Sequence, residues 1–533
     1  MSSDEIIEHL ELMARLMELH DENPFKTRAV SNAAFKLNKL RYNFDGKSKE
    51  DIENIEGIGK GISSKILDLI NTNQTPELAE LLEKTPPGII EVLNIKGLGP
   101  KKVRQLWKEL DIESVGELLY ACNENRLTTL KGFGEKTQNQ VKQNIEFSLS
   151  NRNKYHYAAL EHLMNDFIKL LIENEGGMQA ALCGEMARKC ETIERLEVLI
   201  DRELKNDYKE VLRGLPLPIE FKTCKPEEFY YYKVVYASSS EHIEKAGLNG
   251  LTKKTFGSEE EVYSALQMQY IAPELREGYA EVSLAKAHKL PELITTQDLK
   301  GILHCHSTYS DGVHTLQEMA DECKRLGYTY FGICDHSRSA VYAQGLSAER
   351  VEEQHKEIEK LNAGYSGFKI LKGIESDILN DGSLDYPEDV LKTFDFVVAS
   401  VHSNLKMDEA KATDRLIKAI ENPYTSILGH PSGRLLLARA GYPLDYKKII
   451  DACAANKVSL ELNAHPYRLD IDWRWIPYCL EKNVMISINP DAHHKDGLKD
   501  VHYGVCAARK GLLSKKYCLN ALDLNEIISK FKK

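Results

Sequence analysis

The sequence predicts a multidomain protein that begins with α-helical domains and ends with a distorted β/α barrel. Three observations support this fold class. The 533 residues exceed what a single hydrophobic core accommodates. Three glycine–apolar–glycine turns, each set between helical stretches, occur in the N-terminal part. In the C-terminal part, successive short apolar runs end at histidine or carboxylate side chains, as buried strands followed by functional residues do.

The three turns are Gly57-Ile58-Gly59, Gly97-Leu98-Gly99 and Gly132-Phe133-Gly134. Each precedes a helix that carries lysines, which is the arrangement of a helix-hairpin-helix motif. Glycine permits the tight turn, and the backbone amides at the start of the next helix can bind a phosphate. Lysines beside the turns would neutralise DNA phosphates: Lys60, Lys101, Lys102 and Lys136. The alternative is that all three are only structural turns, because helix hairpins also use glycine as a cap.

The C-terminal runs are typical of a β/α barrel, whose functional residues stand at the carboxyl ends of the strands. In His304-Cys305-His306 the two imidazoles point to the same side of an extended segment, and Asp311 follows in the next loop. The later runs lead to His336, Glu375, His402, His430, Asp491 and His493. A lone histidine after an apolar run is usually a core or surface residue. Nine such side chains at equivalent places favour one shared cluster.

Imidazole and carboxylate ligands without thiolates suit Zn²⁺, Mn²⁺ or Fe²⁺ and suit Ca²⁺ poorly. Nine ligands exceed what one ion needs, so we expect about two or three clustered divalent metals. Such clusters activate water and stabilise both the attacking and the leaving oxygen of a phosphate ester.

Residues from about 298 to the C-terminus resemble a PHP (polymerase and histidinol phosphatase) domain. The matching pieces are H-C-H-S-x-x-S-D-G, C-D-H-S, G-I-E, S-V-H-S, G-H-P and P-D-A-H, with a departure at Pro490, where threonine is commoner. The resemblance implies a trinuclear phosphoesterase. It assigns one metal to His304, His306, Glu375 and Asp491, a second to Glu375, His402 and His430, and a third to Asp311, His336 and His493. The catalytic candidates are Glu375, Asp491, His304 and Arg468, and Asn463 and Arg468 are the expected phosphate contacts.

Residues 1 to about 297 resemble the DNA polymerase X family, whose bacterial members carry a C-terminal PHP domain. Residues 23–29 and the first hairpin are similar to its small N-terminal domain, which binds the 5′-phosphate side of a DNA gap. Lys26, Arg28 and Lys60 are the candidate contacts. The resemblance predicts a small DNA-binding domain (1–85), a fingers-like domain with two hairpins (86–150), an α+β palm-like domain (151–235), a thumb-like domain (236–297) and the PHP domain (298–533). The expected partner is gapped or nicked DNA.

Members of that family carry G-S-x-R-R-x-x-E-x-x-x-D-x-D in the palm and a third aspartate on a neighbouring strand. Those carboxylates hold two Mg²⁺ ions for nucleotidyl transfer. Here Arg188 and Glu191 match, but four positions differ: Glu185 replaces the serine, Arg195 and Glu197 replace the two aspartates, and Glu220 replaces the third. Arginine repels Mg²⁺, and Glu185 would repel an incoming triphosphate. The sequence therefore predicts a degenerate polymerase site without Mg²⁺.

The 11 cysteines are scattered, odd in number and without a C-x-x-C pair, which predicts reduced thiols in a bacterial cytoplasmic protein. A net charge of −11 argues against indiscriminate polyanion binding but allows a local basic track. We find no apolar stretch of membrane-spanning length and no secretory signal. We expect a monomer with no membrane partner.

The leading hypothesis is a DNA-repair protein whose PHP metals hydrolyse DNA phosphodiesters, as a 3′→5′ exonuclease or as a nuclease that processes 3′ ends or abasic sites. A second hypothesis is a gap-filling polymerase that uses Glu197 and Glu220. A third is a DNA-binding scaffold with structural metals. The nine-ligand set argues against the third, because structural zinc sites usually have four ligands.

Overall fold

The computed structural model describes the whole chain except residues 1, 41, 45, 124–125 and 533. It divides into two compact units, Met1–Arg152 and Asn153–Lys533. Among the described residues, no helix combines the length and apolar character needed to cross a membrane. All eleven cysteines are free thiols, as predicted.

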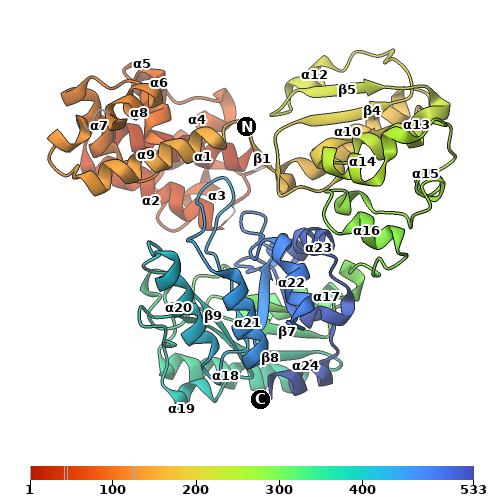
Figure 1. The fold of residues 1–533 in the computed structure, drawn as a ribbon. Coiled ribbons are helices and arrows are strands. Elements are labelled where there is room, and N and C mark those ends of the chain that lie inside the picture. The colour runs from red at the N-terminus through yellow and green to blue at the C-terminus, as the bar shows by residue number, and fades with distance from the viewer. Residues whose placement is uncertain (1, 41, 45, 124–125, 533) are drawn as a thin grey trace. The chain divides into compact units, whose positions relative to one another are not determined.

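Regular structure in the described part of the first unit is helical (Figure 1). Its helices are α1 (Ser3–Leu19), α2 (Pro24–Leu40), α3 (Lys49–Glu53), α4 (Lys60–Thr72), α5 (Pro76–Glu83), α6 (Pro87–Leu93), α7 (Pro100–Leu110), α8 (Val115–Asn123) and α9 (Glu135–Ser150). Ser2 and Glu5 form a capping box that starts α1. One hydrophobic core extends from Ile6 to Ile145. It crosses residue 85, and the domain boundary expected there stays a prediction.

The second unit begins with a small α+β region, which confirms the predicted fold class for the middle of the chain. Its sheet has the order β2-β4-β5, with β2 (Ala180–Leu182) antiparallel and β5 (Ile219–Thr223) parallel to the central β4 (Leu196–Ile200). Val198 packs in the same core as α10 (Tyr157–Asn174), and Leu199 packs with α13 (Phe229–Tyr236). A helix therefore covers each face of this sheet. β1 (Tyr155–His156) and β3 (Thr192–Ile193) form a separate antiparallel pair.

A second small core in this unit joins α13 to the helices that follow it, from Tyr231 to Ala285. Those helices are α14 (Ser240–Ala246), α15 (Glu259–Ala265) and α16 (Glu281–Lys286). Short helices α11 (Gly184–Ala187) and α12 (Lys209–Arg213) flank the β4 strand in sequence. The predicted boundaries at residues 235 and 297 stay predictions.

The C-terminal region is a parallel seven-stranded sheet whose strands neighbour one another in sequence order. They are β6 (Gly301–Cys305), β7 (Tyr330–Ile333), β8 (Lys369–Asp377), β9 (Phe396–Ser400), β10 (Ile427–Leu428), β11 (Ser459–Asn463) and β12 (Ile486–Asn489). Cys305 forms a parallel bridge with Ala492 just beyond β12, so the sheet nearly closes into a barrel. This confirms the predicted distorted β/α barrel.

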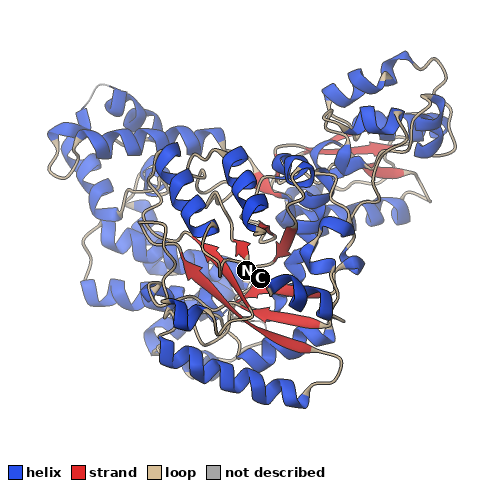
Figure 2. Ribbon diagram, turned by 60° about the horizontal axis from the view of Figure 1, so that its bottom comes forward, coloured by secondary structure: helices blue, strands red, loops and turns tan. Residues whose placement is uncertain are grey.

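Helices surround this sheet, as Figure 2 shows. They are α17 (Leu316–Arg325), α18 (Ala348–Gly364), α19 (Glu388–Leu391), α20 (Glu409–Ile420), α21 (Tyr446–Asn456), α22 (Ile476–Glu481), α23 (Val501–Lys510) and α24 (Leu524–Phe531). Every residue of β6 and β12 is buried, as expected for parallel strands enclosed by helices. The β8 strand differs from expectation: it continues past residue 374, so Glu375 and Asp377 lie within the strand and not in the loop after it.

Candidate metal centre and nucleic-acid interface

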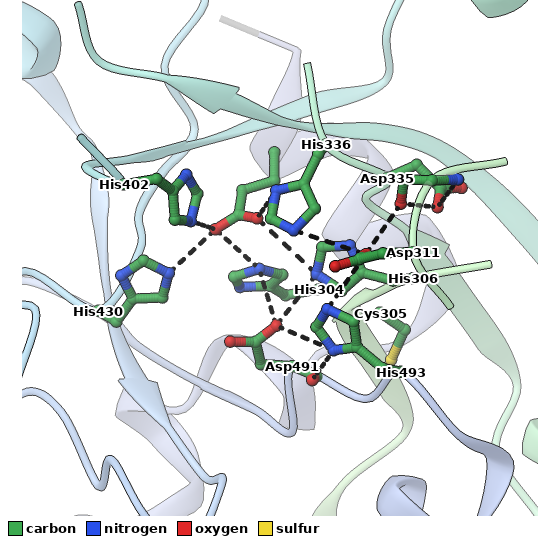
Figure 3. A network of polar contacts seen from close by, with 12 residues as sticks. His304, Cys305, His306, Asp311, Asp335, His336, His402, His430, Asp491 and His493 are labelled. Carbon is green, nitrogen blue, oxygen red and sulfur yellow. Dashed lines mark hydrogen bonds and ion pairs between the residues drawn. The ribbon is translucent and has the colours of Figure 1, made fainter. Parts of the chain in front are cut away.

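The structure brings all nine predicted ligands together at one end of the barrel (Figure 3). Glu375 lies at the middle of the cluster. Its carboxylate oxygens are 3.2 Å from His304 Nε2, 3.0 Å from His430 Nε2, 3.1 Å from His402 Nε2 and 2.9 Å from His336 Nδ1. Asp491 Oδ1 lies 3.0 Å from His306 Nε2, and His493 Nε2 lies 3.3 Å from Asp311 Oδ1.

Four overlapping sets of these side chains have the spacing of a metal site. They are His306, Asp311, His336 and His493; His304, Glu375 and His430; His304, His306 and Asp491; and His336, Glu375 and His402. Glu375 belongs to two sets, as a bridging carboxylate would. The division of the ligands among three individual metals stays a prediction.

His304 in β6 and His306 just after it converge by a different route from the one the sequence suggested. Simple alternation along an extended strand would align them. In the structure the register of β6 with β7 shifts between Ile302 and Cys305, and His304 has a left-handed backbone with φ of 58°. Asp491 also has a positive φ, of 52°. Bulges and strained backbone of this kind occur where a side chain is re-aimed at a functional site.

The electrostatics of the cluster are dominated by buried carboxylates that are opposed by imidazoles. Burial would raise the pKa of Glu375, but His402, His304 and His336 hold that pKa well below its usual value. Burial would lower the pKa of His402, but Glu375 and Asp377 raise it to about 10. For His306, burial together with His493 and His336 lowers the pKa to about 3. The cluster therefore combines buried carboxylates with imidazoles that can exchange a proton for a metal.

Several buried atoms of the cluster make no hydrogen bond within the described part of the chain. His304 Nε2, His336 Nδ1 and Glu375 Oε2 are in ion-pair contact without hydrogen-bond geometry, whereas His306 Nδ1 and His430 Nδ1 make neither kind of contact with another described residue. Buried polar atoms without a partner are uncommon, and a bound ion is one explanation for them. The nitrogen and oxygen donors also fit Zn²⁺, Mn²⁺ or Fe²⁺. The residues present therefore fit a group of divalent metals.

Two carboxylates that no sequence pattern singled out hold imidazoles of the candidate ligands from behind. Glu461 Oε1 accepts a hydrogen bond from His304 Nδ1 at 2.6 Å, and its Oε2 accepts one from the His430 amide at 2.7 Å. Asp377 Oδ1 accepts one from His402 Nδ1 at 2.8 Å. Such partners orient metal-binding histidines and raise their basicity. Asp377 could have been found, because it stands two residues after Glu375 and so shares its strand face.

The two expected phosphate contacts lie beside Asp491. Arg468 Nε is 3.5 Å from Asp491 Oδ2. Asn463 is fully buried, and its amide donates to the same oxygen at 3.1 Å. Asn463 therefore orients this ligand, whereas the partly exposed Arg468 guanidinium faces the cluster from its rim.

The predicted degenerate polymerase site includes residues of strands β4 and β5 of the palm-like sheet. Glu197 and Glu220 are direct partners on parallel strands β4 and β5, as two metal-binding carboxylates would be. Lys222, however, forms ion pairs with both of them, at 3.5 Å from Glu197 Oε1. Glu185 Oε2 accepts hydrogen bonds from the amides of Glu194 and Arg195. A lysine ammonium thus stands where a shared cation would be needed.

The three glycine turns of the first unit have one geometry. Gly57, Gly97 and Gly132 have φ of 86°, 88° and 88°, values that favour glycine. Gly59, Gly99 and Gly134 are the N-caps of α4, α7 and α9, and none makes a side-chain cap, so the first amides of each helix are left for another acceptor. The intervening apolar residues are buried, whereas the six glycines and the candidate contacts Lys26, Arg28, Lys60, Lys101 and Lys136 are exposed and Lys102 is half-buried.

Three family models match parts of the chain. The PHP domain family model matches residues 303–465. A helix-hairpin-helix domain model matches residues 1–75, and a SAM-like helix-hairpin-helix tandem matches residues 89–144.

The similar proteins include one that is matched from end to end. The chain is 33% identical to the DNA polymerase/3′-5′ exonuclease PolX of Bacillus subtilis (strain 168), over 99% of each protein. A probable phosphatase of Acetivibrio thermocellus is 32% identical over 31% of this chain and 65% of its own length. Another from Caldicellulosiruptor bescii is 30% identical over 36% of this chain and 79% of its own length. The chain therefore belongs to the DNA polymerase X family, in the form that carries a C-terminal PHP domain.

Proposed function

We propose that this protein is a DNA-repair nuclease whose PHP domain hydrolyses phosphodiester bonds at 3′ ends, as a 3′→5′ exonuclease or a processor of blocked or abasic ends. The observation that carries this proposal is the cluster of nine histidine and carboxylate side chains with metal-site spacing, several of whose buried nitrogen and oxygen atoms make no hydrogen bond. The similarity to a polymerase and 3′-5′ exonuclease over the full length, and to probable phosphatases over the PHP domain, supports it.

The nine ligands would hold about two or three divalent ions, which when bound supply Lewis-acid catalysis of phosphate-ester hydrolysis. Glu375 and Asp491 provide the negative charge for several cations. Asp377 and Glu461 hold the imidazoles in one orientation, because each accepts a hydrogen bond from the far ring nitrogen. Arg468, whose Nε lies 3.5 Å from Asp491, would bind a non-bridging phosphate oxygen.

We also propose that the palm-like site does not catalyse nucleotidyl transfer. Lys222 neutralises both Glu197 and Glu220, and Arg195 stands in the place of a metal-binding aspartate. If Glu197 and Glu220 bound Mg²⁺ in place of Lys222, the positive side chains of Lys222 and Arg195 would oppose the metal. An active gap-filling polymerase remains the second candidate, and the register of Glu197 with Glu220 is the observation in its favour.

The hairpins of the first unit would deliver gapped or nicked DNA by binding its backbone without reading sequence. Two features support this: α4, α7 and α9 begin with amides that no side chain caps, and lysines lie beside each of these helix N-termini. A cation that contacts phosphate contributes to affinity for any sequence.

The test uses the full-length protein with a gapped duplex whose primer strand carries a 5′ label. With Mn²⁺ we expect progressive shortening of that strand from its 3′ end. With Mg²⁺ and all four nucleotides we expect no primer extension. Glu375→Ala should abolish shortening and leave DNA binding intact. Glu352→Ala, which removes an exposed carboxylate on α18, is the matched control and should behave as the unmodified protein.

Two results would contradict the proposal. Efficient primer extension by the unmodified protein would show that the palm-like site works. Full shortening activity in Glu375→Ala would show that the PHP cluster does not carry the hydrolysis.

A further inference from the structure

Within the second unit, the palm-like region contacts the PHP domain through a motif residue that matches the family pattern. The Glu191 carboxylate accepts a hydrogen bond from Arg434 Nη2, and only 14% of its side chain is exposed. Its neighbour in the motif, Arg188, also turns to a protein partner: its Nε donates to Glu277 at 3.2 Å. These two side chains therefore bind other parts of the protein, and neither is directed to a nucleotide site.

Arg434 lies on the loop after β10, four residues beyond the candidate ligand His430. Its Nε donates to the Arg468 carbonyl oxygen at 2.9 Å, and its Nη2 also donates to the Leu469 carbonyl oxygen. Its Nη1 donates to Asp472 Oδ2 at 3.1 Å. One guanidinium thus ties together the backbone of the segment that carries Arg468.

The charge balance of this buried guanidinium depends on the palm-like region. Burial alone would lower the pKa of Arg434, but Glu191, Asp470 and Asp472 raise it above its usual value. Glu191 is the member of this set that comes from outside the PHP domain. Removing it takes away the carboxylate that Nη2 contacts and leaves Asp470 and Asp472 as the remaining carboxylate partners, so the guanidinium is held less firmly on the palm-like side.

A second contact joins the loop after β10 and the segment that carries Arg468 to the palm-like region. The His156 ring packs against the Tyr467 ring with centroids 4.3 Å apart, and His156 Nε2 lies 3.1 Å from the Leu436 carbonyl oxygen. Tyr467 is the residue before Arg468. The segment that presents Arg468 to Asp491 is therefore held from the palm-like side at two points.

We propose that Glu191 is a positioning residue for the PHP site: by holding Arg434 it fixes Arg468 beside Asp491. The palm-like region then completes the hydrolytic site, although it supplies no group that touches the substrate. This inference rests on the proposed phosphodiesterase function.

The experiment measures hydrolysis of bis(p-nitrophenyl) phosphate with Mn²⁺ by the full-length protein, because this substrate does not need the hairpins. Glu191→Ala should lower kcat about 10-fold, a typical effect for a residue that supports a metal site from outside it. Glu191→Gln should stay within about 3-fold of the unmodified protein, because its amide oxygen still accepts from Arg434. The metal content should be the same in the unmodified protein, in Glu191→Ala and in Glu191→Gln.

The matched control is Glu194→Ala, in the same motif. Glu194 is exposed and pairs with Lys154 at 2.7 Å, so its loss should leave kcat unchanged. Arg434→Lys tests the same link from the other side. It keeps a positive charge, but its three N–H donors on one nitrogen cannot replace the fork by which Arg434 reaches the Arg468 and Leu469 carbonyls, Asp472 and Glu191, so it should lose kcat as Glu191→Ala does. If Glu191→Ala fails to fold, Arg434→Lys still tests whether the contact between Glu191 and Arg434 supports hydrolysis.

A double-mutant cycle separates positioning from general destabilisation. If Glu191 acts through Arg468, adding Glu191→Ala to Arg468→Ala should lower kcat less than about 2-fold further. Equal losses in both backgrounds, or unchanged activity in Glu191→Ala and Arg434→Lys, would overturn the inference alone. Absence of hydrolysis in the unmodified protein and in Glu194→Ala would overturn the proposed function, and the inference with it.

Discussion

The palm-like region and the PHP domain both place carboxylates on parallel strands, yet they neutralise them differently. Glu197 and Glu220 share Lys222, whose pKa is raised chiefly by its hydrogen bond to Glu220. Glu375 and Asp491 are surrounded by imidazoles. A lysine ammonium keeps its proton at neutral pH and cannot coordinate a metal, whereas an imidazole can lose its proton and bind through the same nitrogen. The partner of a carboxylate, more than its presence, therefore decides whether a site can take a metal.

The largest expected effect concerns metal content. Glu375→Gln removes a carboxylate that belongs to two sets of ligands, so we expect the loss of at least about one ion per chain and a fall in hydrolysis of more than about 100-fold. The palm double variant Glu197→Gln/Glu220→Gln should change neither the metal content nor the rate of hydrolysis. Elemental analysis after dialysis against Mn²⁺ measures this. A drop in metal in the palm variant would remove the distinction between the two sites.

The next effect concerns the carboxylates behind the ligands. Asp377→Asn and Glu461→Gln should each weaken metal affinity or activity about 10- to 100-fold, because they orient His402 and His304. The matched control Asp381→Asn, in an exposed position after the same strand, should have no effect. Metal titration followed by calorimetry checks this. Unchanged affinity in both variants would mean that the ligand rings hold their orientation without these partners.

A smaller effect tests the hairpins against the net acidity of the chain. Lys101→Ala/Lys102→Ala should weaken binding to gapped duplex equally for different sequences. It should also reduce the salt slope by about 2, because each lysine is expected to neutralise one phosphate. Lys108→Ala, at the other end of α7 and over the Trp107 ring, serves as control. Binding isotherms at several salt concentrations measure the slope. A slope equal to that of the unmodified protein would exclude these lysines from the DNA interface.

The smallest effect concerns pH and the junction of the palm-like region with the PHP domain. His502 on α23 lies 2.8 Å from Glu161 on α10. Hydrogen bonds with Cys506 and then Glu161 raise its pKa from 6.5 to about 10. Because the folded-state pKa is raised, the stabilisation is complete below about pH 6.5 and is lost as pH rises through about 10.

His502→Gln should therefore lower the unfolding midpoint at pH 7, and the difference from the unmodified protein should shrink at pH 10. The contribution is at most about 1 kcal/mol, because His502 is partly exposed. His162→Gln, an exposed position on α10, is the control. Thermal unfolding at the two pH values measures the difference. A difference in unfolding midpoint that is larger at pH 10 than at pH 7 would contradict a raised pKa of His502 in the folded protein.

The hairpins and the ligands could be predicted because their signals are local. A glycine that needs a positive φ, such as Gly97, leaves its mark in three consecutive residues, and an imidazole at a strand end is visible beside its apolar run. The supporting Glu461 could not be assigned in the same way. It lies in the middle of a buried strand, and its partner His304 is 157 residues away in sequence.

The sequence by itself determined the order of the helical, α+β and barrel regions, the helix-hairpin-helix turns and the set of metal-type ligands, because these depend on hydrophobic period and on residue chemistry. Three features appear only in the folded chain: Glu375 stands among four imidazoles, Lys222 pairs with both Glu197 and Glu220, and Glu191 binds Arg434. Each of these depends on distances across strands and domains, and the free energy of a buried charge depends on whichever partner the fold brings to it.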